Sequence, residues 1–95
     1  MKKKIMVDMS ATLIHHGHIR LIKNAKKYGD VIIGLTTDKQ IRKFKGYSPE
    51  LSFKFRKEIL SEIKGVKKVV PSNWLITQKF LDKHKIDILI SGGDY

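Results

Sequence analysis

The sequence contains no cysteine. Disulfide bonds and thiolate metal sites are therefore excluded, and the fold has to be stabilised by packing, as is usual in a reducing compartment. The N-terminus also lacks a long apolar run, because the lysines at positions 2–4 are followed by only three apolar residues before Asp8. A signal peptide needs a longer apolar segment. We therefore expect a cytoplasmic protein, and neither secretion nor membrane insertion is indicated.

Acidic side chains are scarce. Asp and Glu number 9 against 20 Lys and Arg, which gives a formal net charge of +11 and a pI of about 10.0. Such an excess favours polyanions such as nucleic acid, nucleotides or anionic lipid. No recognised nucleic-acid-binding motif accompanies the charge, so a lysine-rich solvated surface is the simpler interpretation, with attraction for phosphorylated substrates as a further one.

The 95 residues, of which 41% are hydrophobic, are enough for one domain, residues 1–95, with a single core. Apolar runs of strand length alternate with amphipathic segments of helix length. We expect strands at residues 5–7, 31–35, around 69–70 and at 86–90, and helices at 17–28, 52–63 and 74–84. Residues 38–50 are expected to be a loosely structured connection, and Pro71 with Ser72 a turn. Strands separated by helices call for right-handed crossovers, so the sequence predicts an α/β fold with a Rossmann-like, doubly wound parallel sheet.

Two of the predicted helices carry an apolar stripe. The stripe of residues 17–28 consists of Leu21, Ile22, Ala25 and Tyr28, and that of residues 52–63 consists of Phe55, Ile59, Leu60 and Ile63. Arg56 falls on the second stripe. Because an unpaired buried charge is costly, this arginine must either contact an anion or be paired within the fold.

His15 and His18 flank Gly17 at the point where the loop after the first strand becomes a helix. The free N–H groups and the positive dipole end of a helix favour phosphate, and a glycine lets phosphate approach the backbone closely. The three-residue spacing puts both imidazoles on one side of the first turn. There they can donate hydrogen bonds to one phosphate as charge builds during an in-line displacement. The pattern therefore predicts a catalytic phosphate site.

Two other interpretations of the histidine cluster stay open at this point. The side chains can be solvent-exposed without a function, or they can bind a transition metal, although no further ligand nearby completes a first coordination shell. We therefore predict no metal-ligating residue. His16 is expected to point away from the site, and His84, which belongs to a different predicted helix, is expected to lie on the surface.

The chain ends with residues 92–95 directly after the last predicted strand. A doubly wound domain normally continues there into another loop and helix, so we expect the fold to be incomplete at its C-terminus. Ligands of open α/β sheets bind outside the carboxyl ends of the strands. This terminus is therefore expected close to the site.

Residues 9–19 read M-S-A-T-L-I-H-H-G-H-I. This stretch resembles the signature of the cytidylyltransferase family that includes glycerol-3-phosphate cytidylyltransferase, and it is most similar to the branch associated with phosphonate biosynthesis, M-S-A-D-L-I-H-H-G-H. The similarity continues at residues 29–31, 34–38, 56–57, 63–66, 69–71 and 92–95, so it spans essentially the whole chain. An H-x-G-H motif alone is moderately specific, whereas this ordered series is a strong signal.

The resemblance implies transfer of CMP from CTP, with Mg²⁺, to a phosphate or phosphonate oxygen of a small molecule, with release of pyrophosphate. It implies that His15 and His18 stabilise the α-phosphate and that Lys45, the third catalytic candidate, contacts the triphosphate or the acceptor. The further nucleotide-binding residues that it implies are Met9, Ser10, Ala11, Gly17, Lys43, Lys64, Gly92 and Asp94. Relatives are often dimers, which suggests a homodimer, and nucleic acid is not expected as a partner.

Three departures from the family pattern bear on this interpretation. Thr12 stands where relatives carry Asp, and Gly93 replaces the first Asp of the terminal G-D-D-W motif. The R-x-x-x-I-S-T-S/T segment of the family is not found in these 95 residues. The last departure leaves open whether this chain is active without that segment.

Two other functions remain open from the sequence. The first is an adenylyltransferase that uses ATP, because the H-x-G-H motif binds phosphates and does not select the base. The second is a non-catalytic basic module that binds nucleic acid or a partner protein through its lysine-rich helices.

Overall fold

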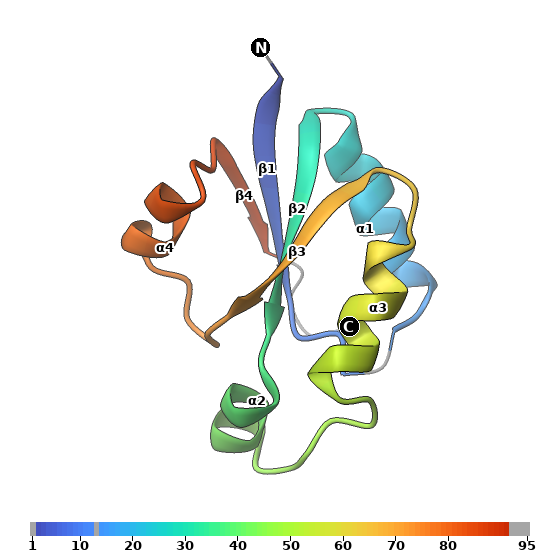
Figure 1. Cartoon of the computed structure of the whole chain (residues 1–95), viewed down its shortest axis with the longest axis vertical. Coiled ribbons are helices and arrows are strands. Elements are labelled where there is room, and N and C mark those ends of the chain that lie inside the picture. The colour runs from blue at the N-terminus through green and yellow to red at the C-terminus, as the bar shows by residue number, and fades with distance from the viewer. Residues whose placement is uncertain (1, 13, 92–95) are drawn as a thin grey trace.

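The computed structural model describes residues 2–12 and 14–91. Its elements follow in the order β1 (Lys3–Met9), α1 (His16–Lys26), β2 (Gly29–Thr36), α2 (Asp38–Lys45), α3 (Phe53–Ser61), β3 (Val66–Ser72), α4 (Gln78–Lys83) and β4 (Ile88–Ser91). The strands form one parallel sheet in the order β3-β2-β1-β4. Helices α1 and α3 cover one face of the sheet and α4 covers the other (Figure 1). The prediction of a doubly wound α/β fold is confirmed.

The strand order places a topological switch point next to β1. From β1 the chain moves to β2 and β3 on one side, and it returns through α4 to place β4 on the other side. Crevices at such switch points, outside the carboxyl ends of the strands, are where open α/β sheets bind ligands. The loops that follow β1, β2 and β3 therefore form the region in which a site is expected.

The core lies on both faces of the sheet, because the side chains of each strand alternate between them. The larger cluster, against α1 and α3, contains Ile5, Val7, Met9, Ala11, Ile22, Ala25, Val31, Ile33, Leu35, Leu60 and Val69. The smaller one, against α4, contains Met6, Ile32 and Val70, with Phe80, Leu81 and Ile86 packed on it. The continuously apolar β2 is thus buried on both faces, as a central parallel strand should be.

Strands β1 and β2 approach each other very closely where they begin. A Cβ added to Gly29 would lie 2.1 Å from the backbone oxygen of Lys3. Only glycine fits at this position of the register, in which Lys3 pairs with Gly29.

The prediction of a loosely structured connection at residues 38–50 is wrong for its first half, which is α2. The Thr37 side chain caps this helix by accepting a hydrogen bond from the backbone N–H of Gln40. Gly46 ends it in the left-handed conformation, with φ 79°, and donates its N–H to the Arg42 carbonyl. Both are ordinary helix boundary signals, a threonine N-cap and a glycine after the last turn. The segment between them is short and highly charged, and its apolar side consists only of Ile41, which is fully buried, and Phe44.

The predicted turn at Pro71 and Ser72 is also wrong, because both residues belong to β3. This strand lies at the edge of the sheet, and an edge strand tolerates a proline whose missing N–H would have faced outward. The helix expected at residues 74–84 is shorter than predicted and comprises only Gln78–Lys83. Thr77 begins it by accepting the N–H of Phe80.

Both predicted apolar stripes need correction. Tyr28 is 63% exposed, and Phe55 and Ile59 are 52% and 43% exposed, so these side chains do not face the core. Arg56 is instead fully buried beside Leu60. The core-facing side of α3 is therefore shifted toward the arginine, because the fold supplies partners for its guanidinium group.

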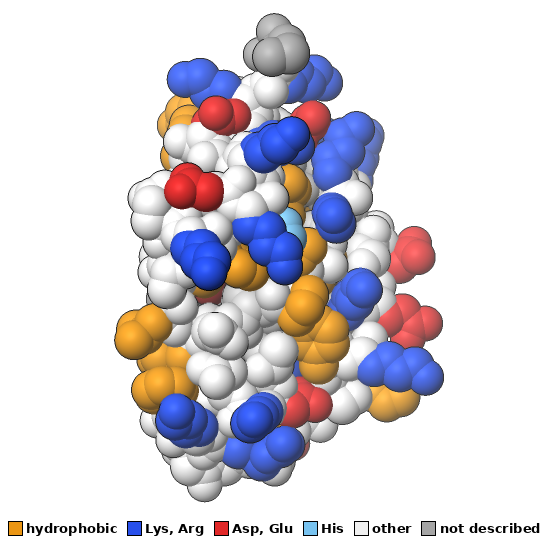
Figure 2. All heavy atoms as spheres, turned by 60° about the vertical axis from the view of Figure 1, so that its left-hand side comes forward, with side chains coloured by type: hydrophobic (Ala, Val, Ile, Leu, Met, Phe, Trp, Pro, Cys, Tyr) orange, Lys and Arg blue, Asp and Glu red, His pale blue; other side chains and the backbone are white. Residues whose placement is uncertain are grey.

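None of the helices in the described part of the chain is long and apolar enough to cross a lipid bilayer. On the face that carries α4, the Lys and Arg side chains are spread from one end of the molecule to the other (Figure 2). This distribution fits a solvated basic surface better than a single stripe that would track a nucleic-acid backbone.

Candidate active site at the carboxyl ends of the strands

His15 and His18 form an unusual capping box at the start of α1. The Nδ1 atom of His15 accepts the backbone N–H of Gly17 at 3.0 Å, and the Nδ1 atom of His18 accepts the backbone N–H of His15 at 3.1 Å. The two ring centroids lie 4.2 Å apart. Each imidazole therefore satisfies a backbone donor that a helix terminus would otherwise leave unpaired, and the helix holds the two rings together.

These hydrogen bonds determine which ring nitrogen can donate. In a neutral imidazole one nitrogen carries the proton and the other accepts. Because Nδ1 accepts from the backbone in both rings, the proton of the neutral form lies on Nε2. Burial, and next the neighbouring His15, lower the pKa of His18 below its usual value. His18, which is only 1% exposed, therefore stays a neutral Nε2 donor at neutral pH.

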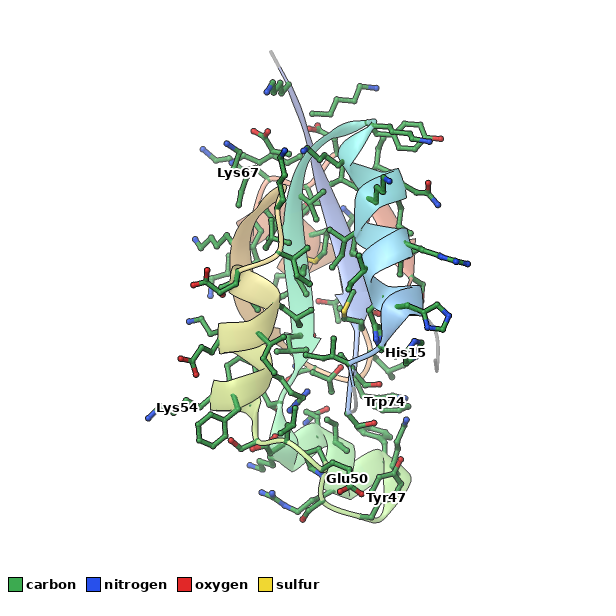
Figure 3. All side chains as sticks on the ribbon, turned by 90° about the vertical axis from the view of Figure 1, so that its right-hand side faces the viewer. His15, Tyr47, Glu50, Lys54, Lys67 and Trp74 are labelled. Atoms are coloured by element: carbon green, nitrogen blue, oxygen red, sulfur yellow. The ribbon has the colours of Figure 1, made fainter. Side chains whose placement is uncertain are left out.

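The backbone around the histidines suits an anion. Helix α1 has 11 residues and no acidic residue in its first turn, so its positive dipole end is not neutralised by a side chain. Gly17 adds no Cβ next to the histidines. Figure 3 shows His15 at the first turn of α1, at the end of the sheet where the strands finish. His16 is exposed, as predicted, on the neighbouring position of the same turn.

The loop between β1 and α1 is anchored by residues that are buried in the core. Ala11 adopts a positive φ of 47°, a conformation that costs a non-glycine residue about 1 kcal/mol. Met9, the last residue of β1, and Ala11 are each 2% exposed and belong to the core. Of the residues at positions 9–11, all predicted to bind nucleotide, only Ser10 is partly exposed. The structure thus places Met9 and Ala11 beneath the candidate site.

Arg56 ties the loops at this end of the sheet to one another. Its guanidinium group donates to the backbone carbonyls of Ser10, Thr36 and Leu51 and to the Asp38 carboxylate at 2.6 Å. Asp38 in turn accepts the N–H of Phe53, at 2.9 and 3.1 Å to its two oxygens. The open question about Arg56 is therefore settled in favour of pairing within the fold, and its role is to position the loops that follow β1 and β2.

The predicted lysines Lys43 and Lys45 lie at the basic end of α2, which follows β2. The Lys45 Nζ lies 5.6 Å from the centroid of the Trp74 ring, and the Trp74 ring stacks on Phe44 with a centroid distance of 5.6 Å. The Lys43 Nζ lies 5.4 Å from the Phe44 ring. The end of α2 is thus docked on the segment that follows β3.

Trp74 was missed as a site residue because the sequence suggested only the start of a helix there. Its backbone N–H donates to Gln40 Oε1 at 3.1 Å, so α2 and the segment after β3 are joined by a hydrogen bond as well as by ring stacking. A lone tryptophan directly after a strand is the signal that could have found it, since such rings often line binding clefts.

The structure does not bring Lys64 to the histidines. Lys64 follows α3 and lines a shallow pocket with Lys23 and Lys26 of α1. Lys67, three residues further along, lies at the opposite end of the sheet from His15 (Figure 3). Gly92 and Asp94, the other predicted contacts, lie outside the described residues. His84, predicted to be on the surface, is half-buried and packs edge to face on Phe80.

Comparison with known proteins places these features in a family. The family model described as cytidylyltransferase-like matches residues 10–95. Glycerol-3-phosphate cytidylyltransferase of Bacillus spizizenii is 36% identical over 95 residues, which cover 98% of this chain and 73% of the relative. Ethanolamine-phosphate cytidylyltransferase of Mus musculus is 33% identical over 93 residues, which cover 96% of this chain but only 23% of the relative.

A solved structure shares the fold. The crystal structure of the lipopolysaccharide core biosynthesis protein from Thermoplasma volcanium GSS1 matches with a TM-score of 0.81 at 26% identity, over 94% of this chain and 73% of the other. The match of the family model over nearly the whole chain agrees with the parallel sheet and with the paired histidines at the start of α1. The chain therefore belongs to the cytidylyltransferase-like family of nucleotidyltransferases.

Proposed function

We propose that this chain binds CTP at the start of α1 and transfers CMP to a phosphate or phosphonate oxygen of a small acceptor, releasing pyrophosphate. The single observation that carries the proposal is the capping box of His15 and His18, in which both Nδ1 atoms accept backbone N–H groups. Two Nε2 donors held 4.2 Å apart, ring centroid to ring centroid, suit the oxygens of one phosphate group.

The chemistry needs positioning and charge stabilisation more than it needs a covalent partner on the protein. An acceptor oxygen attacks the α-phosphorus of CTP, and the bond from that phosphorus to the bridging oxygen of the β-phosphate breaks as pyrophosphate leaves. Negative charge on the equatorial oxygens of the α-phosphate is met by the Nε2 protons of His15 and His18 and by the N-terminal end of α1. No general base is required, because a phosphate monoester has a second pKa of about 6 and is already largely a dianion at neutral pH.

The lysines at the end of α2 supply positive charge. Lys43 and Lys45 lie at the end of the sheet where the strands finish, as the histidines do, and Gly46 directly after them offers a hinge. We assign them to the outer phosphates or to the acceptor anion, where a flexible ammonium is a suitable partner.

Mg²⁺ is the metal that this function implies. The described residues contain no group of three or more His, Cys, Asp or Glu that could hold a metal ion. This donor set fits a Mg²⁺ that is bound mainly by the phosphates of the nucleotide, which is its usual state in nucleotide enzymes. When bound, Mg²⁺ supplies charge neutralisation on the triphosphate, while the histidines orient the α-phosphate.

The test is the release of pyrophosphate from CTP in the presence of a phosphorylated acceptor. In a version of the domain that is extended by the C-terminal segment of the family, we expect His18→Ala to lower the rate by roughly two to three orders of magnitude, the effect of losing one donor to a developing oxyanion. His16→Ala is the matched control, since His16 is exposed in the same turn, and it should leave the rate unchanged. A thermal melt of each variant shows whether it is folded. Near-normal turnover by a folded His18→Ala chain would exclude the proposed role.

The choice of nucleotide is tested separately. The melting temperature of the chain should rise more with CTP and Mg²⁺ than with ATP and Mg²⁺, because a ligand that binds the native state stabilises it. A clear preference for ATP would contradict the nucleotide assignment and leave the role of the histidines intact.

A further inference from the structure

A pocket lined by lysines, the lysine pocket, lies at the end of the sheet where the strands begin. It has a volume of about 570 Å³ and is formed by the starts of the neighbouring strands β1, β2 and β3 and by the end of α1. Figure 3 shows Lys67 at this end of the sheet and His15 at the other. The lysines that line the pocket are Lys2, Lys3, Lys26, Lys27 and Lys67. The lysine pocket is therefore separate from the candidate active site.

The positive charge of the lysine pocket is not balanced by the protein. Five lysines and a single acidic residue, Asp30, line it, which leaves a formal charge of +4. Within residues 2–12 and 14–91, none of these six side chains takes part in an ion pair. Like charges that converge on one pocket repel each other and attract an anion.

The stability of α1 accounts for only part of this cluster. Lys26 belongs to the last turn of the helix and Lys27 is its C-cap, where the helix dipole favours positive charge. Lys3 and Lys67 belong to strands instead, and a sheet has only a small net dipole. They lie on the two neighbours of β2 and so flank the start of that strand from both sides. Their charge needs another explanation.

A β-bulge sets the position of Lys67. In the register between β2 and β3, Val31 pairs with Val66 and Ile32 pairs with Lys68, so Lys67 is the extra residue without a partner on β2. A bulge interrupts the ladder of hydrogen bonds and redirects a side chain, and such irregularities are frequent next to functional sites. The irregularity brings one more ammonium group to the lysine pocket.

Two glycines, Gly29 and Gly65, keep the lysine pocket open. A Cβ at Gly65 would lie 2.7 Å from the Cδ atom of Lys26, just as a Cβ at Gly29 would meet the backbone oxygen of Lys3. Gly65 also has a left-handed backbone, with φ 98°, which glycine adopts without strain. The stem of Lys26 therefore lies on the backbone of Gly65, and packing holds this lysine in place.

An anion with several phosphate groups fits these features. A formal charge of +4 exceeds what one carboxylate can neutralise. The described residues that line the pocket include no arginine, whose planar group would favour carboxylates, and lysines bind phosphate as point charges. Tyr28, which is 63% exposed, adds a hydroxyl donor. A nucleic acid would require an extended basic stripe, whereas these lysines converge on a pocket of small-molecule size.

We propose that the lysine pocket binds a small soluble oligophosphate, as a second anion site of this chain. The proposal does not depend on the proposed function, because the two sites have no residue in common. They lie at opposite ends of α1, whose first turn carries the histidines and whose last turn carries Lys26.

The test is a titration of sodium tripolyphosphate, without Mg²⁺, into the ¹⁵N-labelled whole chain, followed by the amide resonances of its glycines. Gly29 and Gly65 report on the lysine pocket, and Gly17 reports on the nucleotide site. We expect saturable shifts at Gly29 and Gly65. The double substitution Lys3→Gln with Lys67→Gln should weaken the affinity measured there about tenfold, the scale of two exposed ion pairs, and leave the response of Gly17 unchanged.

The matched control is Lys79→Gln with Lys83→Gln, which removes the same charge from exposed positions of α4 and should leave the affinity unchanged. An equal loss in the control would overturn the proposal, because net charge alone would then attract the anion. The absence of saturable shifts at Gly29 and Gly65 would overturn it as well.

Two further outcomes identify the partner and separate the sites. Binding to phosphatidylglycerol vesicles that is lost in Lys3→Gln with Lys67→Gln, without any response to tripolyphosphate, would overturn the proposal in favour of a lipid surface. A response at Gly29 and Gly65 without one at Gly17 would support the lysine pocket and count against the nucleotide site. The two sites can therefore fail independently.

Discussion

Arg56→Lys should reduce the free energy of unfolding by about 3–6 kcal/mol. Arg56 is fully buried and donates to three backbone carbonyls and one carboxylate, which lie on the loop after β1, at the end of β2, at the start of α2 and before α3. A lysine keeps the charge but offers its donors from one atom, so it cannot reach partners on this many segments. Two lost bonds to a charged donor, at about 1.5–3 kcal/mol each, give the expected loss.

The measurement is urea unfolding followed by the fluorescence of Trp74, the only tryptophan of the chain. A domain of this length has a total stability of about 5–14 kcal/mol, so Arg56→Lys should remain folded with a small margin. Asp38→Asn, which keeps an oxygen acceptor and removes the negative charge, should lose less and remains measurable if the lysine variant unfolds. Arg42→Lys on the exposed side of α2 is the control, expected within about 0.5 kcal/mol of the parent. A loss below about 1 kcal/mol in Arg56→Lys would refute the view that this network holds the loops.

Two further predictions concern β1 and its neighbour β2. Asp8 has a folded-state pKa raised from 3.8 to about 6, so between these pH values the folded state binds more protons than the unfolded state, and stability falls as pH rises through this window. Asp8→Asn should therefore stabilise the chain by about 1–2 kcal/mol at pH 7.5, a value reduced to account for the partial exposure of the side chain, and it should have little effect near pH 4. Urea unfolding at both pH values measures this difference. A gain in stability that is confined to low pH would contradict the prediction. Gly29→Ala should lower the free energy of unfolding by more than about 3 kcal/mol, because the Cβ of the alanine would lie 2.1 Å from the Lys3 oxygen and the two strands would have to separate. A melting temperature close to that of the parent chain would contradict this prediction.

Local patterns in the sequence were sufficient for the fold class and for the position of the histidine motif. The apolar run at residues 31–35, the amphipathic segment after His15 and the alternation of strands with helices each depend on neighbours within a few residues, and all of them appear in the structure. The paired histidines were also predictable, because a glycine and two imidazoles at the start of a helix have a local physical meaning.

Three other features of the structure could not be predicted from local sequence patterns. The helix α2 has capping residues, but its apolar side consists only of Ile41 and Phe44 among many charges, so its pattern suggested a loop. The burial of Arg56 depends on carbonyls from segments up to 46 residues away, and the exposure of Phe55 and Ile59 follows from the same rotation of α3. The stacking of Phe44 on Trp74 joins α2 to the segment after β3, and these two segments are neighbours only because β2 and β3 are.

The sequence by itself thus determined most of the elements, their alternation and the position of the histidine motif, since these arise from interactions along a single stretch of chain. Only the tertiary structure decided which side chains meet at the carboxyl ends of the strands. Lys64 lies between α3 and the start of β3, at the opposite end of the sheet from the histidines. Asp8, Gly34 and Ser72, which belong to three different strands, are neighbours in the sheet. The register of a parallel sheet sets such neighbours, and that register depends on packing contacts between residues far apart in the chain.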